Sequence, residues 1–341
     1  MVSPSSAGDF AHRVIAWQKQ SGRHDLPWQQ HGRKGDPYRI WLAEIMLQQT
    51  QVATVIPYYQ RFLARFPDLA RLAAAPSEEV MVLWSGLGYY ARARNLQRAA
   101  QLIVAQWGGR FPRNADDIQT LPGIGRSTAA AIAVFAFGAR AAILDGNVKR
   151  VLARTFGIEG FPGDKAVENR LWALAETLLP ERGIKAYTQG LMDLGATLCT
   201  RSRPRCGACP LAAQCVALRE NRIAELPSPR ARRTVPQRAV TLLVLRCRGR
   251  VLLERRPPKG IWGGLLSLPE LAAGQPARRY AGATQLPVVR HAFTHFRLDI
   301  TPLLCKVSRC NTPEGGIWLN LKALDEAPLP APIRKILASL T

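Results

Sequence analysis

Four cysteines crowd into 17 residues, and their spacing constrains the fold of that region more than any other feature of the chain. They are Cys199, Cys206, Cys209 and Cys215, separated by six, two and five residues. Thiolates this close in sequence usually bind a metal, and four cysteine ligands suit either zinc or an iron–sulfur cluster. The spacing matches neither common ferredoxin pattern, so the residues alone predict a metal-held loop over 199–215 and leave the metal open.

The chain carries a formal net charge of +23 on 341 residues, and both parts of the chain contribute to it. Residues 1–225 have a net charge of +10 and residues 226–341 a net charge of +13, so the charge is not one basic tail. Hydrophobic residues make up 47% of the chain, which is enough for a folded core. A folded and strongly basic protein favours nucleic acid as its partner over an anionic membrane surface.

The sequence also bears on where the protein works. No apolar stretch reaches the ~18–20 residues that a membrane helix needs, and the first residues do not resemble a secretory signal. The cysteine total of seven is odd, which argues against a disulfide framework, and the three cysteines outside the cluster are expected to be structural. We therefore expect a cytoplasmic, nucleoid-associated protein with no membrane contact.

Helical periodicity runs through most of residues 9–225, with glycine and proline breaks at 108–109 and 161–163. Phe10, Val14 and Trp17 mark one face of the first helix. Further helices are predicted at 37–50, 51–66, 77–84, 90–107, 115–120, 126–138, 147–157, 165–179 and 184–198. The fold predicted for residues 1–225 is therefore mainly α.

The pattern changes after residue 225. Residues 226–238 hold three prolines and four arginines, which is typical of a linker. Two Val- and Leu-rich segments, at 239–246 and 250–256, predict a β-hairpin, and alternation over 296–300 predicts a half-buried strand. With a closing helix at 333–340, residues 239–341 are predicted to form a smaller α+β domain.

A glycine-containing segment, residues 121–128, reads Leu-Pro-Gly-Ile-Gly-Arg-Ser-Thr and precedes an alanine-rich helix. Glycine lets the backbone approach a ligand closely, and the start of the next helix presents amide groups to a phosphate. The pattern is typical of a helix-hairpin-helix motif that binds DNA without reading its sequence, with a plain Pro-Gly helix connection as the alternative. The residues expected at the DNA are Leu121, Gly123, Gly125 and Ser127.

Two carboxylates stand in apolar surroundings. Glu44 would share a helix face with Ile40, Trp41 and Leu47, and burial there would raise its pKa toward that of a general acid. The alternative is a helix rolled so that Glu44 reaches solvent. Asp145 ends an apolar run just before a predicted helix, where a simple helix cap is the alternative. Together, one acid and one carboxylate could cleave a glycosidic bond through an oxocarbenium-like state.

These motifs together resemble the MutY-type adenine DNA glycosylases of the helix-hairpin-helix, endonuclease III-like superfamily. The resemblance covers nearly the whole chain and rests on residues 41–50 and 86–92, the hairpin, residues 144–150 and the cysteine spacing. It implies one [4Fe–4S] cluster per chain on the four clustered cysteines. It also implies that Glu44 protonates a flipped adenine at N7, that Asp145 stabilises or attacks the sugar cation, and that Asn147 positions this chemistry.

The same resemblance implies roles for residues that would touch the DNA bases. Gln49 and Tyr89 match the residues that wedge into the base stack beside the opposite base, with a solvated helix face and core packing as their respective alternatives. The segment that lines the adenine pocket matches Leu26, Trp28, Gln29 and Gln189. His24 and Gln29 stand where some members have arginine, and Gln189 where some have glutamate, so the adenine contacts at these three positions depart from the family pattern.

The C-terminal part resembles the MutT-like (NUDIX-like) domain that recognises 8-oxoguanine in such glycosylases. The matching residues include Phe293, Thr294 and His295, where the family usually has serine at position 294. MutT-type hydrolases bind magnesium with a glutamate-rich helix, whereas residues 264–279 contain only Glu270. We therefore expect lesion recognition rather than nucleotide hydrolysis.

The sequence thus predicts a monomeric, monofunctional DNA repair glycosylase that removes adenine opposite 8-oxoguanine or guanine in double-stranded DNA. An endonuclease III-like glycosylase/lyase for oxidised pyrimidines would share the fold, the hairpin and the cluster, but lyase relatives have lysine at the position of Ser127. The charge and the hairpin would also suit a non-enzymatic DNA-binding protein, and residues 239–341 by themselves would suit a nucleotide hydrolase.

Overall fold

The computed structural model describes residues 4–29, 35–230, 234–258, 260–271, 282–293 and 295–340. The chain forms two compact units, and each unit is built from three segments that are separated in the sequence. One unit comprises residues 1–52, 68–70 and 99–232, and the other comprises residues 53–67, 71–98 and 233–341. No helix of the described ranges is long and apolar enough to cross a membrane.

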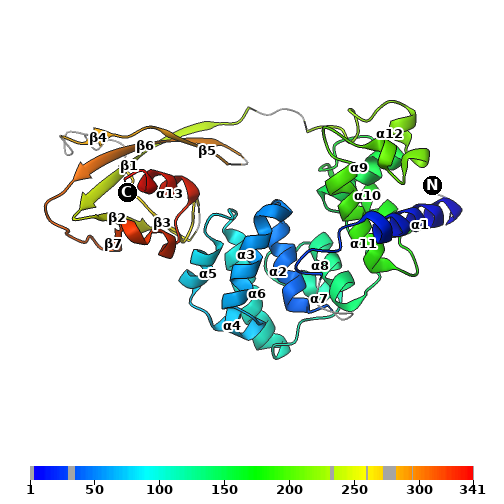
Figure 1. Cartoon of the computed structure of the whole chain (residues 1–341), viewed down its shortest axis with the longest axis horizontal. Coiled ribbons are helices and arrows are strands. Elements are labelled where there is room, and N and C mark those ends of the chain that lie inside the picture. Colours follow the sequence, from blue (N-terminus) through cyan, green and yellow to red (C-terminus); the bar gives the residue numbers. More distant parts are fainter. Residues whose placement is uncertain are drawn as a thin grey trace. The chain divides into compact units, whose positions relative to one another are not determined.

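The first unit is helical. It contains α1 (Pro4–Ser21), α2 (Pro37–Leu47), α7 (Ala115–Gln119), α8 (Arg126–Ile132), α9 (Gly146–Phe156), α10 (Lys165–Thr177), α11 (Ile184–Asp193) and α12 (Val216–Arg219) (Figure 1). π-helical turns continue α8 over Ala133–Phe137 and α11 over Leu194–Leu198, and short 3₁₀ turns occupy Cys206–Ala208 and Ala212–Gln214. The helices predicted at 126–138 and 184–198 therefore each change to π geometry in their last turn.

Local signals set the starts of several of these helices. Asp36 caps α2 by accepting a hydrogen bond from the Tyr38 amide at 2.9 Å, and Pro37 occupies the first helical position, where its missing N–H costs nothing. Asn114 caps α7 in the same way. The core of the unit lies between α1, α9 and α11, where Phe10, Val14 and other apolar side chains are fully buried.

The second unit combines helices with a β-sheet. The helices are α3 (Val52–Arg65) and α5 (Ser77–Trp84), while the residues of α4 (Leu69–Ala74) and α6 (Ala91–Trp107) are divided between the two units. Among these four helices, α4 was not predicted from the sequence. The strands are β1 (Gln237–Cys247), β2 (Arg250–Arg255), β3 (Leu266–Ser267), β4 (Thr284–Gln285), β5 (Val289–Ala292), β6 (Arg297–Lys306) and β7 (Gly316–Asn320).

The sheet has the order β3-β2-β1-β6-β4, with β5 also pairing with β6 and β7 with β2. β1 and β6 run parallel, in register from Gln237 opposite Arg297 to Arg246 opposite Lys306. The 3₁₀ helix η6 (Leu321–Glu326) and α13 (Ala331–Ala338) follow, and α13 buries Ile333, Ile336 and Leu337 in the same apolar cluster as the sheet. The predicted mainly α part and α+β part are thus both confirmed.

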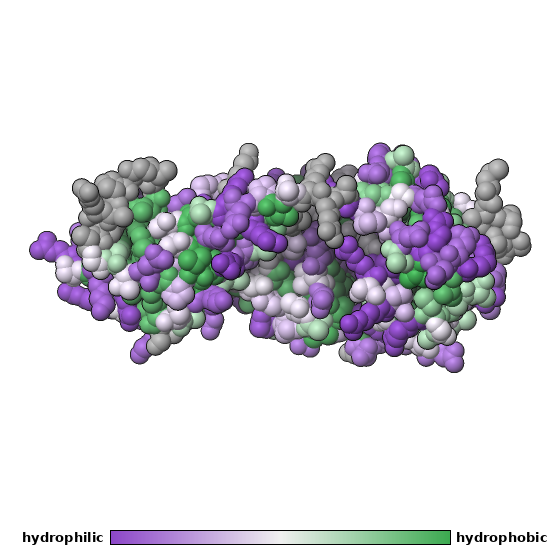
Figure 2. All heavy atoms as spheres, turned by 90° about the horizontal axis from the view of Figure 1, so that it is seen from above, coloured by the Kyte–Doolittle hydropathy of each residue, from purple (hydrophilic) through white to green (hydrophobic). Residues whose placement is uncertain are grey.

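Hydrophilic residues cover much of the surface seen in Figure 2, and hydrophobic patches lie between them. A disulfide that the sequence did not predict joins Cys247 at the end of β1 to Cys310, with Cα atoms 5.6 Å apart. Cys305 and the four clustered cysteines are free thiols.

Candidate active site

The predicted hairpin lies between α7 and α8. Leu121 is buried and holds the turn in the core, while Gly123 adopts a φ of +79° that favours glycine. Gly125 occupies the N-cap of α8 without a capping side chain, so no side-chain oxygen competes for the first amides of the helix. The side-chain amide of Gln48 lies 3.4 Å from both the Gly123 carbonyl oxygen and Thr128 Oγ1, which ties α2 to the hairpin.

Glu44 lies on α2, where Ile40, Trp41 and Ile45 are all buried. Burial of its carboxyl, together with the negative charge of Asp145, raises the pKa of Glu44 from 4.5 to about 8. The structure therefore brings together the two carboxyl groups singled out in the sequence, although about 100 residues separate them in the chain. Glu44 is held as a neutral acid at neutral pH.

Asp145 is the N-cap of α9, and its Oδ1 accepts a hydrogen bond from the Val148 amide at 2.8 Å. The helix-cap interpretation of Asp145 is thus correct, and it does not compete with a role beside Glu44. Burial raises the pKa of Asp145, while hydrogen bonds from the Val148 and Asn147 amides and the positive charges of Arg150 and Lys149 act against that rise. The cap amides and the two cations all favour the ionised carboxylate.

Asn147 lies one residue inside α9. Its Oδ1 accepts a hydrogen bond from Arg150 Nη2 at 2.9 Å, which fixes the orientation of the side-chain amide. Arg150 also donates to the carbonyl oxygens of Cys199 and Gly195, at 2.7 and 2.8 Å. A Cβ atom on Gly195 would lie 2.5 Å from the Asn147 Cβ, so only glycine permits this close approach. Arg150 thus joins Asn147 to the segment that carries the first clustered cysteine.

A buried carboxylate that was not predicted from the sequence, Asp193, binds the predicted pocket residue Gln189 and also Arg23, which lies just before the other three. Asp193, fully buried on α11, accepts hydrogen bonds from the backbone amide and Nε of Arg23 at 2.9 and 2.7 Å. It also accepts one from Gln189 Nε2 at 2.8 Å. Asp193 follows an apolar stretch of helix, and this apolar setting is the only feature of the sequence that could have indicated its burial.

The loop that follows Arg23 is held by hydrogen bonds between its own residues. Leu26 is buried, and the Gln29 side chain accepts a hydrogen bond from the Leu26 amide at 3.2 Å, while the Gln29 amide donates to the Leu26 carbonyl at 2.8 Å. Trp28 lies within this turn and is half-buried. A ring nitrogen of His24 lies 2.9 Å from the Gln18 carbonyl oxygen, so His24 contacts α1. The structure thus places Leu26, Trp28 and Gln29 in one short loop, and Arg23, just before that loop, shares Asp193 with Gln189.

The two predicted wedge residues share an unusual backbone conformation. Gln49 and Tyr89 have φ values of +56° and +48°, which non-glycine residues rarely adopt. Both side chains are exposed, and Tyr89 is 49% accessible, the largest value among the exposed large hydrophobic residues of the described ranges. Core packing, the alternative interpretation of Tyr89, is therefore wrong. Gln49 and Tyr89 belong to different compact units.

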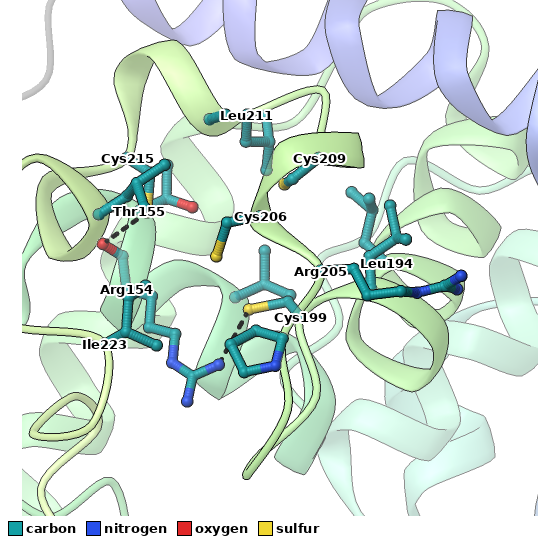
Figure 3. A pocket seen from close by; sticks show the side chains of 15 residues that line it. Arg154, Thr155, Leu194, Cys199, Arg205, Cys206, Cys209, Leu211, Cys215 and Ile223 are labelled. Carbon is teal, nitrogen blue, oxygen red and sulfur yellow. Dashed lines mark hydrogen bonds between the residues drawn. The ribbon is translucent and has the colours of Figure 1, made fainter.

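The four clustered cysteines line one cavity with largely apolar walls, which include Val151, Leu194, Leu198 and Leu211 (Figure 3). Burial raises the pKa of the Cys209 thiol to about 11. Within the described ranges, no three histidine, cysteine or acidic side chains gather as ligands of a single metal ion. A polynuclear cluster lies between its thiolates, so four thiols around a cavity form a donor set that suits it.

Arg154 borders this cavity and was also missed by the sequence analysis. Its Nη1 lies 3.5 Å from Cys199 Sγ and donates to the Thr200 carbonyl at 2.7 Å, while its Nε donates to the Leu226 carbonyl at 2.8 Å. The Cys215 thiol points to the Arg154 carbonyl oxygen at 3.4 Å. This buried cation connects α9, whose N-cap is Asp145, with both ends of the cysteine loop.

In the second unit, the predicted lesion-reading residues lie in an aromatic group. Phe293 stacks on Phe296 with a centroid distance of 4.4 Å, and the His291 ring lies 4.6 Å from Phe293. His295 is exposed and its ring lies 5.7 Å from that of Phe296. Thr294 lies outside the described residues. Trp262 completes the group, with its ring centroid 6.0 Å from that of Phe293.

Comparisons with known proteins define the class. Residues 42–177 match the family described as HhH-GPD superfamily base excision DNA repair protein, and residues 240–339 match the NUDIX domain. A thermostable thymine-DNA glycosylase superposes with a TM-score of 0.56 at 31% identity, over 63% of this chain and 97% of that chain. The structure of a non-covalent endonuclease III–DNA complex superposes with a TM-score of 0.54 at 23% identity, over 65% of this chain and 99% of that chain. This second similarity shows that the two proteins share the fold. The fold and the hairpin are those of a base-excision DNA repair glycosylase.

Relatives that align with nearly the whole chain narrow the class further. The adenine DNA glycosylase of Buchnera aphidicola subsp. Schizaphis graminum is 34% identical over 96% of this chain and 97% of its own. The mouse adenine DNA glycosylase is 32% identical over 96% of this chain and 77% of its own. The chain belongs to the adenine DNA glycosylase family.

Proposed function

We propose that this enzyme excises adenine mispaired with 8-oxoguanine or guanine by hydrolysing its N-glycosidic bond. The observation that carries the proposal is the pair of half-buried carboxyl groups, in which desolvation and the charge of Asp145 raise the pKa of Glu44 to about 8. A pair of carboxyl groups held in different protonation states is the equipment for acid-assisted glycoside cleavage.

Each residue of the pair has a role in the proposed mechanism. The target adenine leaves the stack because its glycosidic bond is inaccessible in a duplex. Protonated Glu44 donates its proton to adenine N7, which makes the base a neutral leaving group. Ionised Asp145 stabilises the sugar cation or attacks it to form a transient adduct. Asn147, whose side chain is oriented by Arg150, positions this chemistry by hydrogen bonding.

Cys199, Cys206, Cys209 and Cys215 would hold one [4Fe–4S] cluster. Bound there, the cluster would act structurally, by holding the cysteine loop in place. Three arginines, Arg201, Arg203 and Arg205, lie in that loop and would contribute positive charge toward a phosphate backbone. Arg154 and Arg150 tie the same loop to α9, so the loop and the catalytic carboxylate Asp145 share one support.

The remaining roles concern the DNA. The hairpin residues Leu121, Gly123, Gly125 and Ser127 would hold the backbone, and Gln49 and Tyr89 would enter the stack. Residues 1–225 would form the catalytic domain, 226–238 a linker and 239–341 the domain that reads 8-oxoguanine. The enzyme would act in the cytoplasm on the nucleoid, as a monomer.

An assay on defined duplexes tests the proposal. Purified enzyme is incubated with duplexes that contain A·8-oxoguanine, A·G, A·T or an oxidised pyrimidine, and strand breaks are scored with and without alkali. We expect alkali-dependent breaks at the adenine of the first two duplexes only. Cleavage of the oxidised pyrimidine without alkali would support the endonuclease III-like alternative.

The NUDIX match gives nucleotide hydrolysis as a second candidate. The sequence after Trp262-Gly263-Gly264 argues against it, because Glu270 is the only carboxylate before Arg278. Release of pyrophosphate from 8-oxo-dGTP with magnesium would favour that candidate.

A further inference from the structure

The turn that carries Tyr89 joins α5 to α6, and it is anchored along its whole length. Ser85 Oγ donates to the Leu329 carbonyl oxygen at 2.8 Å, and the Ser85 carbonyl accepts from the Tyr58 hydroxyl at 2.9 Å. Trp84 Nε1 donates to the Gly88 carbonyl at 3.1 Å. A Cβ on Gly86, whose φ is +97°, would lie 2.3 Å from the Tyr58 hydroxyl oxygen, so this turn tolerates no side chain there. Tyr89 therefore projects from a tightly held turn.

Arg92, in the first turn of α6, lies beneath this exposed tyrosine. The residue is only 8% exposed, although it carries a guanidinium group. Its Nη2 donates to the carbonyl oxygens of Leu87 and Gly88 at 3.2 and 3.4 Å. These two carbonyls belong to the residues just before Tyr89, so the guanidinium fixes the backbone that sets the direction of the tyrosine side chain.

The same guanidinium also contacts aromatic rings. Its Cζ lies 5.4 Å from the centroid of the fully buried Trp84 ring and 5.3 Å from that of Tyr89. Both distances are within the range of cation–π attraction. Burial lowers the pKa of Arg92 to about 10, which leaves it charged at neutral pH. Arg92 thus connects a fixed core ring to an exposed one, and it does so through a planar group that lysine cannot reproduce.

We propose that Arg92 is the positioning residue of the Tyr89 wedge: it holds the tyrosine ring and its left-handed backbone in the conformation that enters the DNA stack. This inference rests on the proposed function, since it assumes that Tyr89 acts as a wedge. Arg92 acts through Tyr89 and does not itself touch the reacting atoms. An already ordered wedge would enter the base stack without first losing conformational freedom, which is the advantage of a preorganised contact.

A double-mutant cycle tests the proposal. The variants are Arg92→Met, Tyr89→Leu and both together, with Arg98→Met as the matched control, because Arg98 is exposed on the same helix. kcat and KM for adenine excision are measured on A·8-oxoguanine duplex. Backbone hydrogen exchange of residues 85–90 is measured on the full-length protein without DNA. Thermal melting shows that each variant is folded.

We expect Arg92→Met to lower kcat/KM by about tenfold to a hundredfold, which is the loss expected when a catalytic assembly is slightly misplaced. The double variant should be no worse than Tyr89→Leu alone, because the loss passes through the tyrosine. Exchange over 85–90 should quicken in Arg92→Met and stay unchanged in Arg98→Met. Arg92→Lys keeps a cation in the core and should fall between wild type and Arg92→Met in both measurements.

Two results would overturn the inference. One is a double variant whose loss is the product of the two single losses, because Arg92 would then act independently of Tyr89. The other is unchanged exchange over 85–90 in both Arg92→Met and Arg92→Lys. Failure of the proposed function is distinguishable, since wild-type enzyme would then leave adenine in the duplex while the exchange measurement still reports on the turn.

Discussion

The Ser127 hydroxyl oxygen accepts a hydrogen bond from the backbone amide of Leu144 at 2.9 Å. Ser127 belongs to the hairpin helix α8, and Leu144 immediately precedes Asp145, the N-cap of α9. The hairpin that would hold the DNA backbone is therefore joined directly to the segment that presents Asp145, the proposed catalytic carboxylate. The resemblance places lysine at this position in the lyase relatives. Here the position is Ser127, whose hydroxyl is hydrogen-bonded within the protein.

Because a hydroxyl cannot form an imine with the opened sugar, we expect the enzyme to stop at the abasic site. Incubation with A·8-oxoguanine duplex should give strand breaks only after alkali, and borohydride should trap little covalent complex. Efficient trapping that disappears when one particular lysine is replaced would show that this chain has a dedicated lyase amine.

Replacing Glu44 with glutamine should abolish general acid catalysis while nearly preserving side-chain volume. Excision in single-turnover assays should fall by about 10²–10⁴-fold, the usual contribution of a positioned acid, while duplex binding persists. Glu225→Gln serves as a control, since Glu225 lies on the surface, where its carboxylate pairs with Arg222 at 3.1 Å. Near-normal excision by Glu44→Gln would remove Glu44 from the mechanism.

The raised pKa of Glu44 predicts both a pH–rate profile and a stability effect. Excision should fall as the pH rises through about 8, where Glu44 loses its proton, and also toward acid as Asp145 becomes protonated. Between pH 4.5 and about 8 the folded state binds a proton at Glu44 that the unfolded state has lost, so this group makes the protein less stable as the pH rises.

Glu44→Gln should therefore melt at a higher temperature than wild type, with a difference that grows from about pH 5 to about pH 8. The gain in unfolding free energy should reach a few kcal/mol, at about 1.4 kcal/mol for each unit of pKa shift. A difference in melting temperature that does not vary with pH would contradict the assignment of this pKa to Glu44.

Much of this molecule could be predicted from its sequence, because its signals are local. The helix over 77–84 follows from periodicity alone, and the hairpin and the cysteine loop follow from glycine and cysteine spacing. The π turns after Ile132 and Asp193 could not be predicted, since apolar periodicity over a few residues does not distinguish an α turn from a π turn. Pairing of β1 with β6 joins residues 60 positions apart, which no local pattern encodes.

The supporting residues of the site were missed for a related reason. Asp193, Arg154 and Arg92 are charged residues within helical segments, and the sequence does not show which charged side chains of a helix are buried. Only the fold shows that they are buried, and that their hydrogen bonds hold the loops carrying the candidate site residues.

Asp193→Asn should test how the adenine-pocket loop is held. The substitution leaves Arg23 without its buried counter-charge, and we expect a loss of about 3 kcal/mol, the lower end for breaking a buried pair because Arg23 is partly exposed. Asp9→Asn, which removes an exposed pair with Arg13, should cost less than about 1 kcal/mol. Urea unfolding measures the loss of unfolding free energy in each variant. Equal and small losses in Asp193→Asn and Asp9→Asn would show that Asp193 does not anchor the loop.

The aromatic group of the second unit should govern the choice of mispair rather than the chemistry. Phe293→Ala removes a ring that stacks at 4.4 Å on the buried Phe296 and leaves Phe296 itself in the core. If Phe293 reads 8-oxoguanine, kcat/KM on A·8-oxoguanine duplex should fall by roughly five- to a hundredfold, the value of one base–aromatic stack, while kcat/KM on A·G duplex changes little. His295→Ala should lower the same kcat/KM but by a smaller factor, because His295 is exposed.

Val288→Ala is the control, because Val288 is an exposed apolar residue of the same unit, and it should leave kcat/KM on both duplexes unchanged. Equal losses on the two duplexes in Phe293→Ala would mean that the ring supports the fold and does not read the lesion.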